Sequence, residues 1–287
     1  DTARNVLARC AEPTMLTPPI RAFINQPSPI IVAKASFVSR VHRRSHAEYI
    51  GVKRYDERSE VIGETRFVGL FTSEAYTRAA DEVPLIRRKI ENVKAAAPQG
   101  LRFSAKQLDS VLKTYLRDEL FQISEADLAR ISSGVLRLLL RPRTHLFIRR
   151  DRFDRYVSAL LYTPRDSYTS ELRTRAHKKL AEAYGGRTSA FYPSFGDGPL
   201  ARVHLIIGLS PGHPEPDEDS LDLQMRQLFE TWEDALGRVA RSTNSDQSLL
   251  TRAQFSVAYK ENFQPEEGLA DLLAIGGLAP GKAMRTR

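Results

Sequence analysis

The sequence predicts an α+β protein, in which an antiparallel sheet and a helical connector precede a second unit with the element order βαββαβ. Three observations predict this class. Near the N-terminus, two runs of alternating apolar and polar residues flank a short polar turn. Apolar residues then recur at helical spacing through the middle of the chain. In the second half, strand-like and helix-like segments alternate.

The composition indicates a globular protein of more than one domain. The 287 residues are 41% hydrophobic and 27% charged, and a chain of this length usually forms roughly two domains. The single cysteine excludes an internal disulfide framework and favours a reducing compartment. Because no apolar run approaches the ~20 residues of a membrane helix, we expect a cytoplasmic protein without a membrane partner.

The first strands follow a proline-containing segment. Residues 1–28 contain several prolines and few periodic apolar positions, which predicts an extended entry segment. The run 28–35 is apolar and β-branched, as in a buried strand. Residues 47–56 and 61–73 alternate and predict a hairpin that turns near Asp56–Glu60. We expect the strand at 47–56 to direct its apolar side chains inward and its charges outward.

Helix-start signals mark the middle of the chain. Pro84 suits a first helical turn, residues 104–107 read Ser-Ala-Lys-Gln, the pattern of a capping box, and residues 124–127 begin another helix. Pro142 ends that helix. The sequence therefore predicts a first domain at 29–100 and a helical connector at 101–142.

The second unit, expected at 143–260, has a ferredoxin-like order. From Tyr156 onward the pattern is strand, helix, strand, strand, helix. We expect the closing strand at 253–259, which makes the strand at 144–150 an extra one. One amphipathic helix is expected from Ser220 to Val239. Residues 261–287 would begin a linker to a further domain.

No motif predicts catalysis, a metal or a cofactor in this chain. His42 and His46 are four residues apart, which on a strand places them about 13 Å apart at roughly 3.3 Å per residue, too far for one metal ion. Neither a Gly-rich nucleotide loop nor a nucleophile elbow is present. We therefore predict no catalytic residue.

The basic residues leave a second interpretation of the function open. The chain carries 43 basic and 35 acidic residues, a net charge of +8. Short basic groups at 42–44, 87–89, 141–143 and 149–152 all have acidic neighbours. A nucleic-acid-binding surface should be a contiguous basic stripe. Because these basic groups are scattered, we expect them to lie on solvent-exposed faces or to form salt bridges between domains. A polyanion-binding module remains the alternative, although no nucleic-acid partner is predicted.

Several ordered segments resemble one enzyme family. They include VHRRSHAEYIGVKRYD, GETRFVGLFTSEAY, RDELFQIS and ELRTRAHKKLAEAYGG, and their order is that of the very large bacterial NAD-dependent glutamate dehydrogenases. Leu116 departs from the family pattern, where a proline is expected before RDELFQ. The resemblance implies a segment of the N-terminal region, ahead of the catalytic domain.

The resemblance also implies a division of roles. It identifies 29–100 as PAS-like and 143–260 as ACT-like. The parent enzyme would oxidise L-glutamate to 2-oxoglutarate and ammonium with NAD, which would bind outside this chain. The segment itself would lack a cofactor, regulate or assemble the enzyme, and contact the rest of its subunit and a homo-oligomer.

The resemblance directs attention to one loop as an effector site. ACT-like units often hold amino acids in the loop after their first strand, here residues 163–168. Arg165 would bind an effector carboxylate, and Asp166 and the backbone near Ser167 would complete the site. The competing interpretation is that Arg165 and Asp166 only shape a turn and a helix cap.

Overall fold

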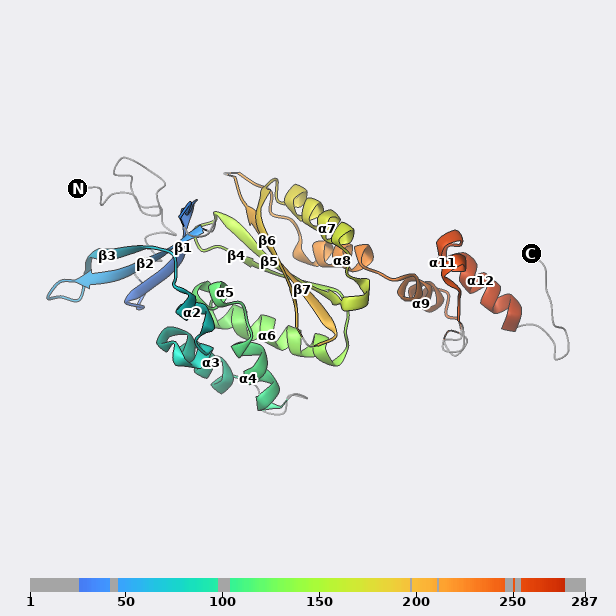
Figure 1. Ribbon diagram of the computed structural model, residues 1–287, viewed down its shortest axis with the longest axis horizontal. Coiled ribbons are helices and arrows are strands. Elements are labelled where there is room, and N and C mark those ends of the chain that lie inside the picture. The colour runs from blue at the N-terminus through green and yellow to red at the C-terminus, as the bar shows by residue number, and fades with distance from the viewer. Residues whose placement is uncertain are drawn as a thin grey trace.

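The α+β class is confirmed in a computed structural model, which describes residues 26–41, 46–97, 104–196, 198–210, 212–245, 250 and 254–276. Figure 1 shows a first sheet, a group of helices, a second sheet and a separate C-terminal group of helices. Most of the predicted entry segment and His42 lie outside the described residues. Within the described part of the chain, no helix is both long and apolar enough to span a membrane.

The first sheet is the predicted antiparallel meander. It has the strand order β1-β2-β3, with bounds β1 (Ile30–Val38), β2 (His46–Tyr55) and β3 (Val61–Gly69). The hairpin turns where expected. The Asp56 carboxylate accepts the backbone N–H groups of Arg58 and Glu60, each at 2.9 Å, and this local pattern is what an aspartate contributes to a tight turn.

The expectation that β2 points its charges outward is wrong at two positions. Glu48 and Lys53 are both buried. Lys53 shares a face with buried Tyr49, because side chains alternate along a strand, and its ammonium donates to the carbonyl of Gln26. Glu48 lies opposite Lys34 in the strand register and forms an ion pair with it. Burying a charged group is costly unless the group is paired, and the partners of Glu48 and Lys53 offset that cost.

The middle of the chain is helical, and its starts follow the sequence signals. Pro84 occupies the first turn of α3, Ser104 and Gln107 form a capping box, and Ser124 caps the last long helix. The elements are α2 (Ser73–Thr77), η2 (Ala80–Glu82), α3 (Pro84–Ala95), α4 (Ala105–Lys113), α5 (Arg117–Gln122) and α6 (Glu125–Leu140).

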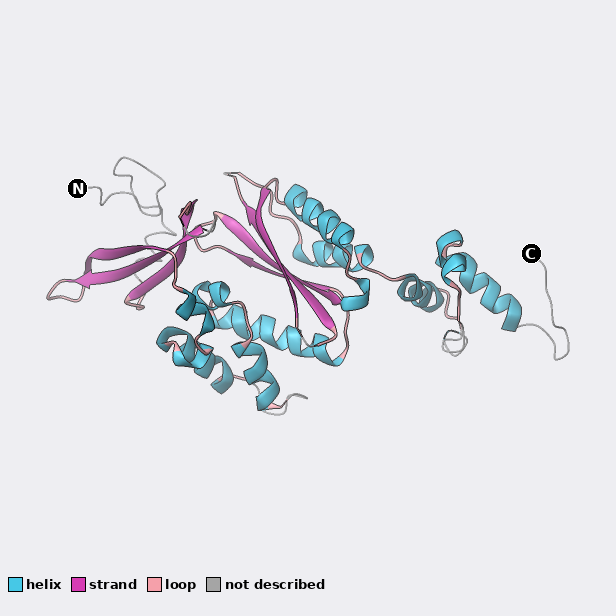
Figure 2. Ribbon diagram, viewed as in Figure 1, coloured by secondary structure: helices cyan, strands magenta, loops and turns pink. Residues whose placement is uncertain are grey.

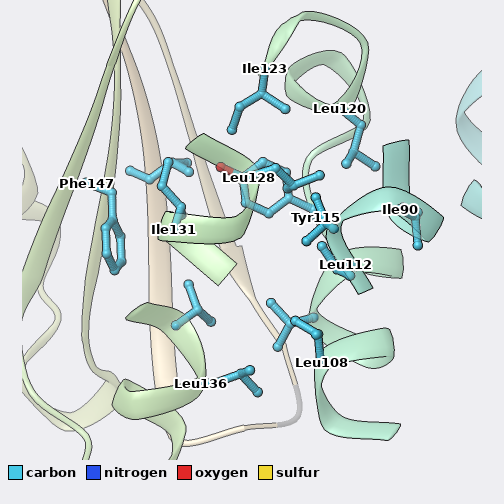
Figure 3. Packing of buried hydrophobic residues seen from close by; sticks show 14 of the residues in the cluster. Ile90, Leu108, Leu112, Tyr115, Leu120, Ile123, Leu128, Ile131, Leu136 and Phe147 are labelled. Carbon is cyan, nitrogen blue, oxygen red and sulfur yellow. The ribbon is translucent and has the colours of Figure 1, made fainter. Parts of the chain in front are cut away.

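These helices share one core with part of the second sheet (Figure 3). The helix α3, which the sequence analysis placed with the first sheet, packs into this core rather than into that sheet. Phe147 and Leu160 of the second sheet complete it. The buried side chains labelled in the figure are Ile90, Leu108, Leu112, Tyr115, Leu120, Ile123, Leu128, Ile131, Leu136 and Phe147.

The second sheet is antiparallel, with the order β4-β5-β7-β6. Its strands are β4 (His145–Arg150), β5 (Tyr156–Pro164), β6 (Arg187–Phe195) and β7 (Leu200–Gly208). The helices α7 (Ser170–Ala183) and α8 (Glu218–Leu228) cover one face, while α6 lies on the opposite side (Figure 2). Gly185, with φ +54°, follows the C-cap of α7, a position that favours glycine.

The predicted closing strand at 253–259 is wrong. Ser256 caps a helix there, α11 (Val257–Asn262), by accepting the N–H of Tyr259 at 3.1 Å. The position beside β5 is taken by β4, which comes from the N-terminal side. The unit therefore keeps the ferredoxin-like arrangement of four strands and two helices, but its edge strand precedes the first central strand.

The expected single helix from Ser220 is two helices. The helix α8 ends at Leu228 and α9 (Trp232–Ser242) begins after Thr231, which forms a capping box with Asp234. The helix α9 then packs with α12 (Pro265–Gly276) in a core of its own. In that core the Trp232 indole N–H donates to the Phe263 carbonyl at 2.8 Å.

Gly134 sets how closely α6 approaches the second sheet. A Cβ atom there would lie 2.5 Å from a ring carbon of Phe147, which is buried. We expect Gly134→Ala to destabilise the protein by ~1–3 kcal/mol through overpacking, which exceeds the ~1 kcal/mol gain in helix propensity. The control Gly237→Ala, whose Cβ meets only Arg241 at 3.4 Å, should be stabilising. Calorimetric unfolding of both variants tests this, and unchanged stability of Gly134→Ala would contradict it.

Candidate functional site

A cavity of about 640 Å³ lies where the first sheet, α5 and the second sheet meet. One wall of the cavity is formed by a face of the second sheet, namely the face that α7 and α8 do not cover. This junction is the candidate functional site, because small-molecule sites typically measure ~300–1,000 Å³ and favour domain interfaces. The principal lining side chains are Lys34, Ala35 and His46 from the first sheet, Asp118, Glu119 and Gln122 from α5, and Arg155, Tyr156, Ala190, Tyr192, His204 and Ile206 from the second sheet and its β4–β5 turn.

Strand alternation explains which side chains reach the cavity. Val203, Leu205 and Ile207 of β7 pack under α7 and α8, so His204 and Ile206 point to the other face. The same rule turns Tyr156 of β5 toward the cavity. Farther along β5 and β4, this face is covered by α6, and the cavity is the part of the face that α6 leaves open.

The β4–β5 turn of the second sheet packs against the first sheet and joins the two sheets. Phe153 in that turn is buried with Ile31, Ala33 and Tyr49 of the first sheet. Arg155 donates to the Lys34 carbonyl, and its other guanidinium nitrogens bind the Asp151 carboxylate at 2.7 and 3.1 Å. One wall of the cavity is therefore fixed by both apolar and polar contacts.

A buried ion pair lies beside the cavity, and its acidic member, Glu119, lines the cavity. The Arg149 guanidinium on β4 donates two hydrogen bonds, of 2.7 and 2.9 Å, to the Glu119 carboxylate on α5. Both side chains are buried. Burial favours a raised pKa for Glu119, but the adjacent Arg149 outweighs burial and holds that pKa at about 2. The pair therefore stays ionised at neutral pH and joins the helices to the second sheet.

His204, which also lines the cavity, and Ser158 extend this buried polar cluster. The Ser158 hydroxyl lies 2.9 Å from Nε2 of His204, and the same nitrogen lies 3.8 Å from Oε1 of Glu119. A catalytic triad needs the serine and the carboxylate on opposite nitrogens of the imidazole, so this arrangement does not activate a nucleophile. Burial lowers the pKa of His204, and the neutral ring serves as a hydrogen-bonding surface.

The rim of the cavity carries charges from different elements. The Asp118 carboxylate accepts a hydrogen bond from the Tyr76 hydroxyl at 2.8 Å and lies 3.4 Å from the Lys34 ammonium. Lys34 also binds Glu48. Burial lowers the pKa of His46, which lines the same wall. The rim thus combines a carboxylate, a cation and a neutral imidazole.

The predicted effector loop lies elsewhere. Arg165, Asp166 and Ser167 form the short 3-10 turn η3 (Arg165–Ser167) at the far end of β5 from Tyr156. The Arg165 N–H donates to the Pro199 carbonyl at 3.0 Å, and its guanidinium lies 6.0 Å from the centre of the Phe195 ring. None of the three residues lines the cavity. Their role as an effector site stays a prediction.

The basic groups of the sequence are divided among structural contacts. The Lys89 ammonium donates to the Leu120 and Ile123 carbonyls at 2.6 and 2.7 Å, closing the end of α5. Arg149 is buried with Glu119, and Arg150 pairs with Asp154 and Glu215. Among the described residues, three of the cations that suggested a polyanion footprint are therefore engaged within the protein.

The sequence carried a weak signal for this site. Ser158 and His204 interrupt the apolar strands Tyr156–Pro164 and Leu200–Gly208, and buried polar residues need partners. Their partner Glu119 lies on a separate helix, which strand patterns do not reveal. Within the described part of the chain, no three His, Cys, Asp or Glu side chains gather as a metal site would require.

Two family models match the chain. The model described as glutamate dehydrogenase, helical motif 1 matches residues 83–141, and the model described as glutamate dehydrogenase, ACT2 domain matches residues 145–233. The first range holds α3 to α6 and the second begins at β4 and ends at the start of α9. The matches therefore follow the packing of the structure, including the position of β4 as the first strand of its unit.

Curated relatives are similar over most of the chain. The NAD-specific glutamate dehydrogenase of Halomonas elongata is 34% identical over 268 residues, 90% of this chain and 16% of the relative. The enzymes of the same name from Pseudomonas aeruginosa and Mycobacterium tuberculosis are 30% and 28% identical over 88% and 86% of the chain. The chain spans 16% of the length of each of these relatives.

The buried pair predicts an acid-sensitive junction. The pKa of Glu119 is lowered from 4.5 to about 2, so its stabilisation is complete above pH 4.5 and is lost as the pH falls toward about 2. We expect Glu119→Gln to lower the free energy of unfolding at neutral pH by on the order of 3 kcal/mol and to flatten this acid dependence. Denaturant unfolding across this pH range tests it.

The matched control is Glu91→Gln on the exposed side of α3, which should leave both the stability and its pH dependence unchanged. An acid dependence in Glu119→Gln as steep as that of the unmodified chain would contradict the assignment.

Proposed function

The chain belongs to the glutamate dehydrogenases whose helical motif 1 and ACT2 domain it carries, and we propose that it is part of the N-terminal regulatory and assembly region of an NAD-specific enzyme. The observation that carries this proposal is the similarity of 90% of the chain to a relative of that name. The parent reaction would convert L-glutamate, NAD and water into 2-oxoglutarate, ammonium and NADH in the cytoplasm, with NAD bound outside this chain.

The organisation of the chain supports a regulatory role. Its first sheet, which we assign to a PAS-like unit, touches the ACT2 sheet and helical motif 1 at one junction that combines apolar and polar contacts. Lys34 of the first sheet meets Asp118 of α5, and Arg155 of the β4–β5 turn meets the Lys34 carbonyl. A shift of any one of these units changes contacts at the other two, because packed interfaces rearrange between discrete states rather than deform continuously.

An edge strand supports the assembly role. The strand β6 is an edge of the second sheet, and it exposes Phe191, Tyr192 and Phe195 at 41%, 49% and 50%. An exposed edge with large apolar side chains is suited to pairing with another chain. We propose that this edge contacts the rest of the same subunit or a further subunit of a homo-oligomer.

If this chain has a regulatory and assembly role and NAD binds elsewhere in the parent enzyme, the chain alone should be inactive. The isolated 287-residue chain should produce no NADH from L-glutamate and NAD, because its sequence has no Gly-rich nucleotide loop and the cavity residues that the structure describes do not activate a nucleophile. The full-length parent should produce NADH under the same conditions. Absorbance of NADH measures both, and glutamate-dependent NADH formation by the isolated, folded chain would contradict the proposal.

A further inference from the structure

The strand β3 is an unprotected sheet edge. The edge strands of the two sheets are β1, β3, β4 and β6. Other elements bond to two of them, since Arg155 donates to the Lys34 carbonyl of β1 and Asp222 accepts the Leu146 N–H of β4. In β6, Pro193 has no N–H to offer a neighbouring strand. Among the described residues, no hydrogen bond links β3 to a group outside the β2–β3 hairpin.

The strand β3 also exposes large apolar side chains. Ile62, Phe67 and Val68 are 60%, 57% and 51% exposed, and the β2–β3 hairpin projects away from the helices and the second sheet (Figure 1). An exposed edge strand with apolar side chains is a template for pairing with another strand. The residue order of β3 indicates which strand that is.

The sequence of β3 is self-complementary in an antiparallel pair. Its middle reads Gly63-Glu64-Thr65-Arg66-Phe67. When two copies lie antiparallel with Thr65 opposite Thr65, Glu64 of each copy faces Arg66 of the other. Gly63 of each copy then faces Phe67 of the other. Opposite charges and threonines in facing positions stabilise a sheet, and an aromatic ring covers the gap that a facing glycine leaves.

Sheet geometry selects this register. A two-fold axis perpendicular to the sheet keeps its two faces continuous, and side chains alternate between the faces, so the numbers of facing residues must both be odd or both be even. An axis at Glu64 or at Arg66 would place two like charges opposite each other, which is destabilising. An axis at Thr65, the middle residue of β3, avoids both clashes and pairs the largest number of residues. The irregularity in the β2–β3 register next to Tyr55 lies at the end of β3, outside this central segment.

Glu64 and Arg66 keep hydrogen-bonding capacity for a partner copy. Within one copy, Nε of Arg66 donates to Oε1 of Glu64 at 2.6 Å, and both side chains are part-buried. A guanidinium has more N–H donors, and a carboxylate more acceptor positions, than this one bond uses. At the two-fold axis, the two pairs would place four charges of alternating sign next to one another.

The other face of β3 would gain apolar contacts. Phe67 faces Ile50 of β2, which in turn faces Val32 of β1, and Ile50 and Val32 are only half-buried. In the pair of copies, the second Phe67 would lie over Gly63 and continue this apolar row across the axis. Burial of that surface contributes hydrophobic free energy, so the pairing does not depend on the charges alone.

We propose that two copies of this chain associate through β3, antiparallel about Thr65, and join their three-stranded sheets into one continuous sheet. The partner is a second copy because β3 complements itself, whereas an unrelated strand would have to match Glu64 and Arg66 through its own sequence. This proposal rests on the assembly role proposed above and names a surface for it that is distinct from β6.

Sedimentation velocity on the 287-residue chain tests the pairing, and we expect a dimer. Arg66→Glu and Glu64→Arg each place like charges in facing positions, so each should raise the dissociation constant by about tenfold or more. The double variant Glu64→Arg/Arg66→Glu exchanges the charges and should dimerise as the unmodified chain does. An equimolar mixture of the two single variants should form a mixed dimer, because each acidic side chain then faces a basic one.

The mixture separates the pairing from a folding defect, because a misfolded variant would not regain association. The control Arg88→Glu reverses an exposed charge on α3 and should leave the dissociation constant unchanged. A monomeric unmodified chain would overturn the proposal. Association that both single variants retain would also overturn it, as would single variants that fail to associate when mixed.

A cross-link tests the same contact in the full-length parent enzyme. Facing Cα atoms in an antiparallel pair lie ~4.5–5.5 Å apart, a separation that a disulfide can span. Thr65→Cys should therefore give disulfide-linked pairs of subunits on oxidation, whereas Arg58→Cys in the exposed hairpin turn should not. A dimer of the chain without cross-linked parent subunits would overturn the role in assembly. The proposed function fails separately, through NADH formation by the isolated chain.

Discussion

The ion pair between Glu119 and Arg149 is the contact on which the rest of the junction depends. It joins a six-residue helix, too short to hold its place by its own hydrogen bonds, to the edge strand of the second sheet. The neighbouring residue Asp118 is thereby presented to Lys34 of the first sheet. One buried charge pair thus holds the helix whose residues Asp118 and Glu119 line the cavity.

The cost of burying these charges explains why so many polar groups surround them. Two desolvated ions are stable only when geometry and further hydrogen bonds compensate. The Tyr156 hydroxyl donates to Gln122 of α5, the helix that carries Glu119. Ser158 and His204 lie beside the Glu119 carboxylate. An apolar core joins the helices to the second sheet elsewhere, but apolar side chains in place of this polar cluster would leave no polar surface for a ligand.

Local signals in the sequence predicted local structure well. Pro84, Ser104 and Ser124 mark helix starts, and Asp56 shapes its turn, because each acts on a backbone group within a few residues. The break before Trp232 had the same kind of signal in Thr231 and Asp234, but the continuous apolar spacing of the two helices concealed it.

Long-range partners could not be predicted in this way. The edge position beside β5 is filled by β4, its neighbour across a short turn, and not by the distant residues 253–259, part of which forms α11. The burial of Lys53 depends on the carbonyl of Gln26, and the cavity requires side chains from three separate units. No periodicity within a single segment contains that information.

Hydrogen exchange in the parent enzyme tests most directly whether α5 links the sheets. In Arg149→Met, amide exchange should accelerate in α5 and also in β1, whose Lys34 contacts Asp118. The helix α12, which packs in a separate core, should be unchanged and serves as the internal control. Acceleration confined to β4, with α5 and β1 as protected as in the unmodified enzyme, would contradict the account.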